Sequence, residues 1–279
     1  MIRLLSLLLL LLVAVAIPAA AQQGAGTPKR AEEAGQREVP AANPGRPTVA
    51  TPATLTPVGY LQFESGFLGA GDSLGLSSQY SFNEVMKLTV TPRLQFLVST
   101  EPFAWSASQN VSTSSAGGLS LGVQGVLYQG EGAKPTLAVG YFRQVYAGDA
   151  PDLDIESQVN SFQVLASADV KGFHYDANAF FSEVAEVPVR RAQYGEAFSV
   201  SHPFLKKFTL SGEIWHFTQP FLSGNAVGNL WGISYTVRKN LILDVAFNRG
   251  LTATSTQWEG TAGFTYVLPQ RLWPIHEHR

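Results

Sequence analysis

Strict alternation of apolar and polar residues is the feature of this chain that most limits its fold. Residues 241–250 divide into an apolar and a polar set, which are Leu243, Val245 and Phe247 against Asp244, Ala246 and Asn248. After a polar loop, residues 258–268 alternate in the same way. Successive side chains of a strand point to opposite faces, so each segment predicts a strand with one apolar and one polar face. The apolar face must meet either a packed core or lipid.

The same alternation recurs from residue 57 onward and predicts about twelve strands. Tight turns at 91–93, 171–172 and 238–240 alternate with longer polar connections, including 68–75, 102–117 and 147–157. A meander with short turns at one end and long loops at the other is typical of outer-membrane β-barrels. Glu84 breaks the pattern, because it falls among the apolar residues of its segment.

The composition of the polar face indicates that it lines a water-filled lumen rather than the outer surface of a soluble protein. Charged residues make up only 14% of the chain, against about 25% in ordinary soluble domains. A soluble β-sandwich also alternates, but it normally carries many Lys and Glu residues outside. Apolar faces about ten residues long match tilted strands that cross a bilayer, and only closure removes unpaired backbone groups from lipid. We therefore predict an all-β fold, a transmembrane antiparallel meander β-barrel with its apolar face toward lipid.

The N-terminal composition predicts export. Arg3, an apolar run from Leu4 to Ile17, and Ala19–Ala21 are typical of a secretory signal peptide at 1–21, with a membrane anchor as the alternative. Residues 22–54 are rich in Ala, Gly, Pro, Gln and charge, and predict a disordered linker. The expected barrel spans 55–268, and 269–279 form a C-terminal tail.

Few residues suggest catalysis or metal binding. A net charge of −2 gives no nucleic-acid footprint, and the absence of cysteine excludes disulfides and thiolate sites. His174 and Asp176 share a face, where the Asp could orient the imidazole, although lumenal polar packing is the favoured reading. An acidic stretch at 148–156 offers oxygen ligands for calcium, with a solvated loop as the favoured reading. We expect no catalytic residues, no metal and no cofactor.

The polar and charged residues predicted to face the lumen say most about function. Carboxylates facing a narrow pore favour cations; alternatively, they pair with bases and fill a closed barrel. Eight strands fill with side chains and sixteen leave an open channel, so twelve permit either outcome. The polar faces predict these pore-lining residues: Gln62, Glu64, Lys87, Gln95, Gln124, Gln144, Asp169, His174, Asp176, Glu213, Asp244 and Glu259.

Three stretches carry a family resemblance. They are TPVGYLQFESGF at 56–67, VTPRLQFLVST at 90–100 and NLILDVAFNRGLT at 240–252. Together they resemble the phenol-degradation (MetA-pathway) outer-membrane transporter family over residues 55–268. The resemblance implies an outer-membrane channel, with small aromatic or apolar compounds as candidate solutes.

The sequence thus predicts a passive outer-membrane channel for small solutes, filtered by the 102–117 and 147–157 loops and not an enzyme. A lipid hydrolase is one alternative, and His216 is the histidine nearest the predicted lipid face. A structural or adhesive barrel with a blocked lumen is another. The expected location is the outer membrane of a Gram-negative (diderm) bacterium, with periplasm-facing termini. Expected partners are outer-membrane lipid, a small-molecule solute and the barrel-assembly machinery, without nucleic acid.

Overall fold

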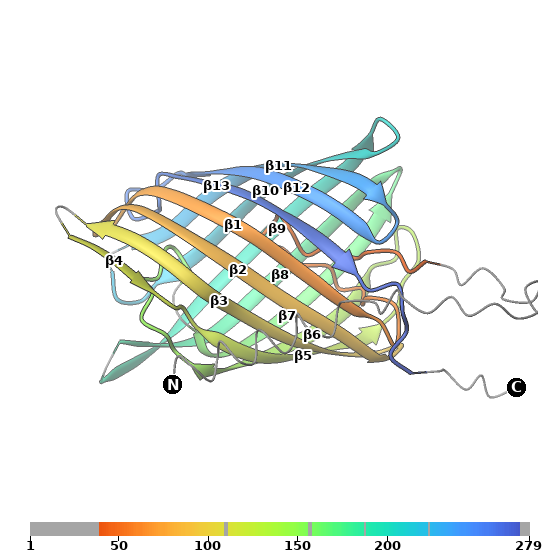
Figure 1. Cartoon of the computed structure of the whole chain (residues 1–279), viewed down its shortest axis with the longest axis horizontal. Coiled ribbons are helices and arrows are strands. Elements are labelled where there is room, and N and C mark those ends of the chain that lie inside the picture. The colour runs from red at the N-terminus through yellow and green to blue at the C-terminus, as the bar shows by residue number, and fades with distance from the viewer. Residues whose placement is uncertain (1–38, 109–110, 156–157, 187, 223, 274–279) are drawn as a thin grey trace, which may run out of the picture. The chain divides into compact units, whose positions relative to one another are not determined.

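Antiparallel strands form a closed barrel in the computed structural model (Figure 1). The structure describes residues 39–108, 111–155, 158–186, 188–222 and 224–273, which belong to one compact unit. The expected signal peptide, the expected linker as far as residue 38, and residues 274–279 of the expected tail lie outside the described residues. Among the described residues, no helix is long and apolar enough to cross a membrane.

Twelve strands close the barrel, as predicted. Each of the twelve pairs with the next strand of the ring, which passes from β3 directly to β5, and β1 pairs with β13 to complete the ring. The short β4 lies outside this ring and pairs only with the Ala104–Ser108 end of β3. The strands of the described chain are β1 (Leu61–Ser73), β2 (Leu76–Thr91), β3 (Leu94–Ser108), β4 (Val111–Ser115), β5 (Leu119–Tyr128), β6 (Thr136–Tyr146), β7 (Gln158–Val170), β8 (Phe173–Glu186), β9 (Val189–Phe204), β10 (Phe208–Gln219), β11 (Gly224–Arg238), β12 (Leu241–Gly250) and β13 (Trp258–Val267).

The barrel turns its apolar face outward. Val245 and Phe247 on β12 are about half exposed, at 51% and 52%, whereas Asp244 between Leu243 and Val245 is only 4% exposed. A soluble protein would show the reverse arrangement, because water would meet the polar set. The alternation in 241–268 therefore describes a strand pair whose apolar side chains suit lipid and whose polar side chains face the lumen.

Several expected loops are strands instead. Residues 68–73 continue β1, and the chain reverses at once through a turn in which Asp72 and Gly75 have φ of 56° and 82°. Most of 102–117 likewise belongs to β3 and β4. Both faces of a hairpin that extends beyond the bilayer meet water, so its residues need not alternate. The polar composition of residues 68–73 and 102–117 therefore did not reveal that most of them continue the strands.

Glu84 lies where the pairing of β2 with β3 is irregular. The register shifts between Phe82 and Glu84, and Glu84 is half-buried next to residues of the outer face. A β-bulge re-aims side chains at the point where an extra residue enters the ladder. The sequence anomaly at Glu84 thus marks a local break in strand pairing.

The outward apolar face gives a direct stability test. Replacing Val245 by Arg places a charge on the lipid face, and we expect the free energy of unfolding to fall by about 2–4 kcal/mol. Ser120 faces the lumen, so Ser120→Arg is the matched control and should cost much less. Urea unfolding in vesicles, followed by tryptophan fluorescence, measures both. Equal losses for the two variants would contradict the assignment of faces.

Candidate functional site

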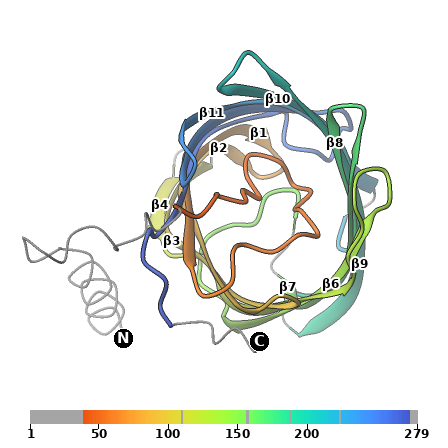
Figure 2. The same cartoon turned by 90° about the vertical axis from the view of Figure 1, so that its right-hand side faces the viewer.

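A segment before β1 occupies the lumen, and we name residues 42–56 the collar. Figure 2 looks into one end of the barrel and shows this segment inside the ring of strands. It was expected to be part of a disordered linker, but residues 39–54 are described and partly buried, with Ala50 and Ala53 fully buried. The expectation fails for these residues because polar groups of the wall bind the backbone of the segment, and the composition of the segment does not reveal these contacts.

The collar follows the inner wall in the order of the strands. Ala42 donates its N–H to Lys239 in the β11–β12 turn, at 2.8 Å. The wall partners of the residues that follow lie successively on β1, β12, β10, β8, β7 and β5, and finally on β3 and β2. The collar therefore makes one circuit of the lumen before the chain enters β1.

Two glutamates on the wall bind backbone N–H groups of the collar. Glu213 on β10 accepts from Val49 at 2.8 Å and from Ala50 at 2.6 Å. Glu64 on β1 accepts from Gly45 at 3.1 Å and forms an ion pair with Lys87 at 2.5 Å. A buried carboxylate is costly unless donors surround it, so these contacts stabilise both the wall and the collar.

Arg46 occupies a recess made by two facing glycines. Its Nη2 lies 3.2 Å from Oδ1 of Asp244. Gly66 and Gly263 are opposite each other on β1 and β13, and a Cβ on either one would collide with the Arg46 guanidinium. The absence of a side chain at these two positions therefore makes room for the arginine.

Apolar patches on the inner wall receive the small residues of the collar. Ala50 packs in a buried cluster with Phe180, Trp215 and Phe217, and Val49 lies against it. Ala53 belongs to a second cluster, with Val126, Ala138 and Leu165. Alanine is small enough to let the backbone approach the wall, so the collar combines hydrogen bonds with close apolar contact.

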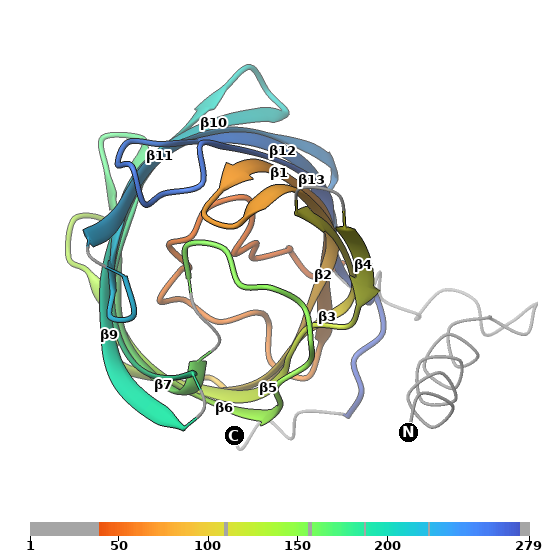
Figure 3. The same ribbon diagram turned by 90° about the vertical axis from the view of Figure 1, so that its left-hand side faces the viewer.

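The β6–β7 connection also folds into the lumen, as Figure 3 shows from the opposite end. Asp154 is buried and accepts hydrogen bonds from Thr256, at 2.7 Å from the N–H and 3.2 Å from the hydroxyl. Gln79 donates to the carbonyl of Pro151 at 3.3 Å. Burial raises the pKa of Asp154, while the hydrogen bonds from Thr256 act in the opposite direction. We name residues 151–155 the roof.

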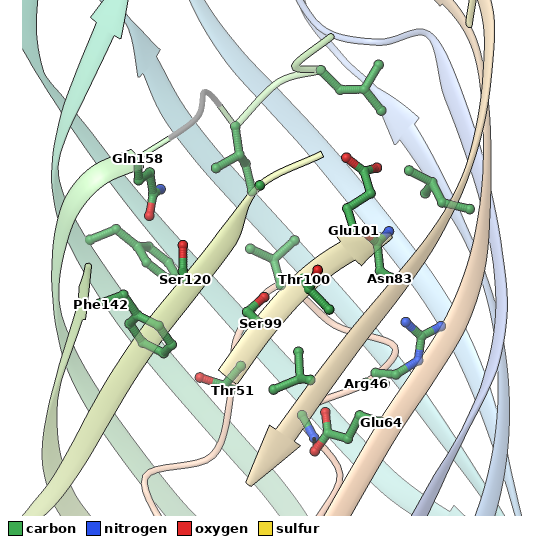
Figure 4. A pocket seen from close by; sticks show the side chains of 18 of the residues that line it. Arg46, Thr51, Glu64, Asn83, Ser99, Thr100, Glu101, Ser120, Phe142 and Gln158 are labelled. Carbon is green, nitrogen blue, oxygen red and sulfur yellow. Dashed lines mark hydrogen bonds between the residues drawn. The ribbon is translucent and has the colours of Figure 1, made fainter. Parts of the chain in front are cut away.

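A chamber of about 610 Å³ lies between the collar and the roof. Figure 4 shows Arg46, Asn83 and Glu101 on one side of it, with Phe142 and Ser120 across from them. Ligand cavities generally measure about 300–1,000 Å³, so the chamber has the size of a site for one small molecule. Its lining mixes amide, hydroxyl and carboxyl groups with aromatic rings.

The predicted pore-lining residues lie on the inner face, and most of them contact the collar or the chamber. Gln62, Glu64, Gln95, Gln124, Glu213 and Asp244 bind the collar, and Lys87 does so through Glu64. Gln144 and Glu259 line the chamber. That these residues line a conducting pore remains a prediction.

The remaining three predicted residues, Asp169, His174 and Asp176, form one network near the turn end, with His174 between the two carboxylates. Nδ1 of His174 lies 2.8 Å from Asp169 and its Nε2 3.2 Å from Asp176. Ser167 donates its hydroxyl proton to Asp176 at 2.5 Å and accepts from Ala53 N–H at 2.7 Å. The serine is thus bonded to a carboxylate rather than to the imidazole, an arrangement that supports the collar and does not activate a nucleophile.

Sequence reasoning missed Arg46 and the inward position of the roof. Arg46 lies within a stretch of Pro, Gly and Ala that has the composition of a linker. The acidic stretch that holds Asp154 was interpreted as a solvated loop, yet Asp154 is only 5% exposed. A usable signal for Arg46 was the pair Gly66 and Gly263, since glycine inside a strand often marks a close approach by another segment.

Comparisons with known proteins show the fold. No family model and no curated protein matches the sequence. The COG4313 outer-membrane channel from Pseudomonas putida F1 is 14% identical, with a TM-score of 0.58 over 77% of this chain and 98% of that one. The KdgM porin is 12% identical, with a TM-score of 0.52 over 77% of this chain and 99% of that one. This chain therefore has the fold of Gram-negative outer-membrane channel barrels.

Glu213 should control how firmly the collar is held. Glu213→Ala removes two hydrogen bonds to a carboxylate, each worth about 1.5–3 kcal/mol. The chain has no cysteine, so Thr48→Cys supplies a single reporter on the collar. We expect maleimide labelling of this cysteine to accelerate about tenfold or more in the Glu213→Ala background. Glu196→Ala, on the outer face, is the control, and an equal acceleration there would contradict the role of Glu213.

Asp154 should make attachment of the roof depend on pH. Because its pKa is raised in the folded state, its contribution is fully present below the ordinary carboxyl pKa of about 3.9 and is lost as pH rises through the raised value. Protection of the Thr256 amide against hydrogen exchange, corrected for the intrinsic rate, should therefore decline with rising pH. Asp154→Asn stays neutral and should flatten the profile. Identical profiles would show that Asp154 does not govern the attachment.

Proposed function

We propose that this chain is a passive outer-membrane channel for small solutes. The observation that carries the proposal is the chamber of about 610 Å³ between the collar and the roof, inside a barrel whose exterior is apolar. A barrel held together only for structural reasons has no need of a cavity lined by Glu101, Gln144 and Phe142. Likeness to the barrels of outer-membrane channels supports the same function.

The route through the barrel would pass the roof, cross the chamber and leave beside the collar. The two segments enter from opposite ends of the lumen, so a solute must pass both. The proposed filter therefore differs from the expected one, because the 147–157 loop takes part while most of 102–117 is strand. Movement would be diffusive and needs no cofactor or energy source.

The chamber supports solutes that have an apolar or aromatic part. Phe142, Phe180 and Trp215 all line it, and Leu97 and Leu153 add aliphatic surface. Rings of this kind pack against flat apolar molecules in small-molecule sites. The resemblance to the phenol-degradation transporter family agrees with this choice, and it rests on the sequence motifs alone.

The outer membrane of a Gram-negative bacterium is the proposed location, with lipid around the barrel and the tight turns and both termini on the periplasmic side. Short turns on that side and longer connections outside are the general arrangement of such barrels. The barrel-assembly machinery is the expected partner in biogenesis. We propose no catalytic role, since His174 is engaged by two carboxylates.

A structural barrel with a blocked lumen is the second candidate, because the collar makes a full circuit of the lumen. A lipid hydrolase has less support. His216 contacts Glu196 at 3.1 Å on the outer face, and such a pair still requires a nucleophile within reach.

Conductance of the full chain in a planar bilayer under a salt gradient tests the proposal. We expect stable current steps with a reversal potential that indicates cation preference, because carboxylates outnumber bases in the chamber lining. Glu213→Ala is measured in parallel. An inserted, folded wild-type protein that gives no steps, together with a conducting Glu213→Ala variant, would contradict the channel and support the blocked barrel.

A further inference from the structure

The chamber is neutral at its collar side. Of the described residues that line it, Arg46 and Lys87 carry positive charge. Arg46 pairs with Asp244 at 3.2 Å, and Lys87 pairs with Glu64 at 2.5 Å. Each base is therefore matched by a carboxylate of the wall, and this side offers little net charge to a solute.

The roof side is acidic. Four carboxyl groups line the chamber there, from Glu101, Asp152, Asp154 and Glu259. Glu101 is near enough to Asp152, and Glu259 near enough to Asp154, for the charges of each pair to repel each other. The lining bases lie at the collar side, so the potential at the roof favours a cation.

Buried oxygen atoms without a hydrogen bond point to the same ligand. Oε1 of Gln79 and Oδ2 of Asp154 are both buried and have no hydrogen-bond partner in the structure. The two residues are 2% and 5% exposed, and both line the chamber. The amide oxygen of Gln79 can only accept a hydrogen bond, and the same holds for Asp154 when its carboxyl group is ionised. Leaving a buried acceptor unpaired is costly. A donor from a bound solute would satisfy both.

Strand register places these groups along one part of the wall. Glu259 is opposite Ala70, and Ala70 is opposite Gln79. Neighbouring strands are about 4.8 Å apart, so the backbones at Glu259 and Gln79 are separated by roughly 10 Å. Glu101 lies on the next strand, β3, five residues from Ser106, which is the partner of Gln79. Among the residues that the structure describes, no group of three or more acidic or histidine side chains could hold one metal ion, which needs ligands within about 2.6 Å. The carboxyl groups suit an organic cation with several N–H donors.

The aromatic lining of the chamber supplies the other half of the recognition. Phe142, on β6, and Phe180, on β8, come from a part of the wall separate from β13 and β3, which carry Glu259 and Glu101. A molecule with an ammonium group at one end and an apolar body at the other would meet complementary surfaces at both ends. A carboxylate-bearing solute of the same shape would be repelled by the roof.

We propose that the solutes of this channel are small organic ammonium compounds with an apolar body. This inference rests on the proposed function, since it names the substrate class of the same chamber. The ammonium group binds among Glu101, Asp154, Glu259 and Gln79, and the apolar body packs against Phe142 and Phe180.

Three probes of one shape test the inference on the full chain in a planar bilayer. Benzylammonium carries a positive charge, benzoate a negative charge, and benzyl alcohol none. We expect benzylammonium to interrupt the potassium chloride current and to permeate at least about fivefold better than benzoate, as a cation-focusing site requires. Quenching of tryptophan fluorescence measures binding separately, because Trp215 lines the chamber. Benzylammonium should quench at lower concentrations than benzyl alcohol.

Neutral variants of the roof side identify the residues. Glu101→Gln and Glu259→Gln keep the side-chain shape and remove one charge each, and we expect the apparent affinity for benzylammonium to fall about fivefold or more in each. Glu196→Gln removes the same charge from the outer face and should change neither binding nor block. Migration of the unheated protein on a gel reports that each variant is folded.

The outcomes separate the two proposals. Potassium chloride steps with equal effects of benzylammonium and benzoate would leave the channel standing and overturn the ammonium preference. Unchanged benzylammonium affinity in both folded roof variants would overturn it as well. No steps at all from folded, inserted wild-type protein would reject the channel itself, and benzylammonium binding by fluorescence would then still report on the chamber.

Discussion

The fold depends on how carboxylates that face inward find hydrogen-bond donors. A barrel of twelve strands has a lumen wider than its own side chains fill, and its alternating pattern turns Glu64 and Glu213 into that lumen. Strand backbones are already engaged in the ladder, so further donors must come from elsewhere. The N–H groups of Gly45, Val49 and Ala50 provide them. The collar and the inner wall therefore stabilise each other.

The same contacts define the site. The collar bounds the chamber on one side, and the roof, attached through Asp154 to Thr256, bounds it on the other. The ion pairs of Arg46 and Lys87 neutralise the collar side, which leaves the charge of the chamber to the acidic groups near the roof. The distribution of charge in the chamber thus follows from where the collar lies, since the collar contributes Arg46 and the apolar contacts of Val49 and Ala50.

Most of the barrel wall could be predicted from the sequence, but the two segments inside the lumen, the collar and the roof, could not. Period-two alternation gave the strands, the outward position of Val245 and the inward position of Asp244, because side-chain direction in a strand depends only on local spacing. The collar was missed because its residues resemble a linker: they bury few large apolar groups and are held by wall carboxylates and amides. Asp154 was taken for a solvent residue because its burial depends on Thr256, which is distant in the sequence.

Amide hydrogen exchange of the folded full chain is the measurement that tests the central claim most directly. The N–H groups of Gly45, Val49, Ala50, Ala53 and Thr56 all donate to side chains of the wall. If the collar lies in the lumen as described, these amides exchange far more slowly than in an unstructured peptide, and Glu213→Ala releases those of Val49 and Ala50 first. Exchange at the unstructured rate in a folded barrel would contradict the account.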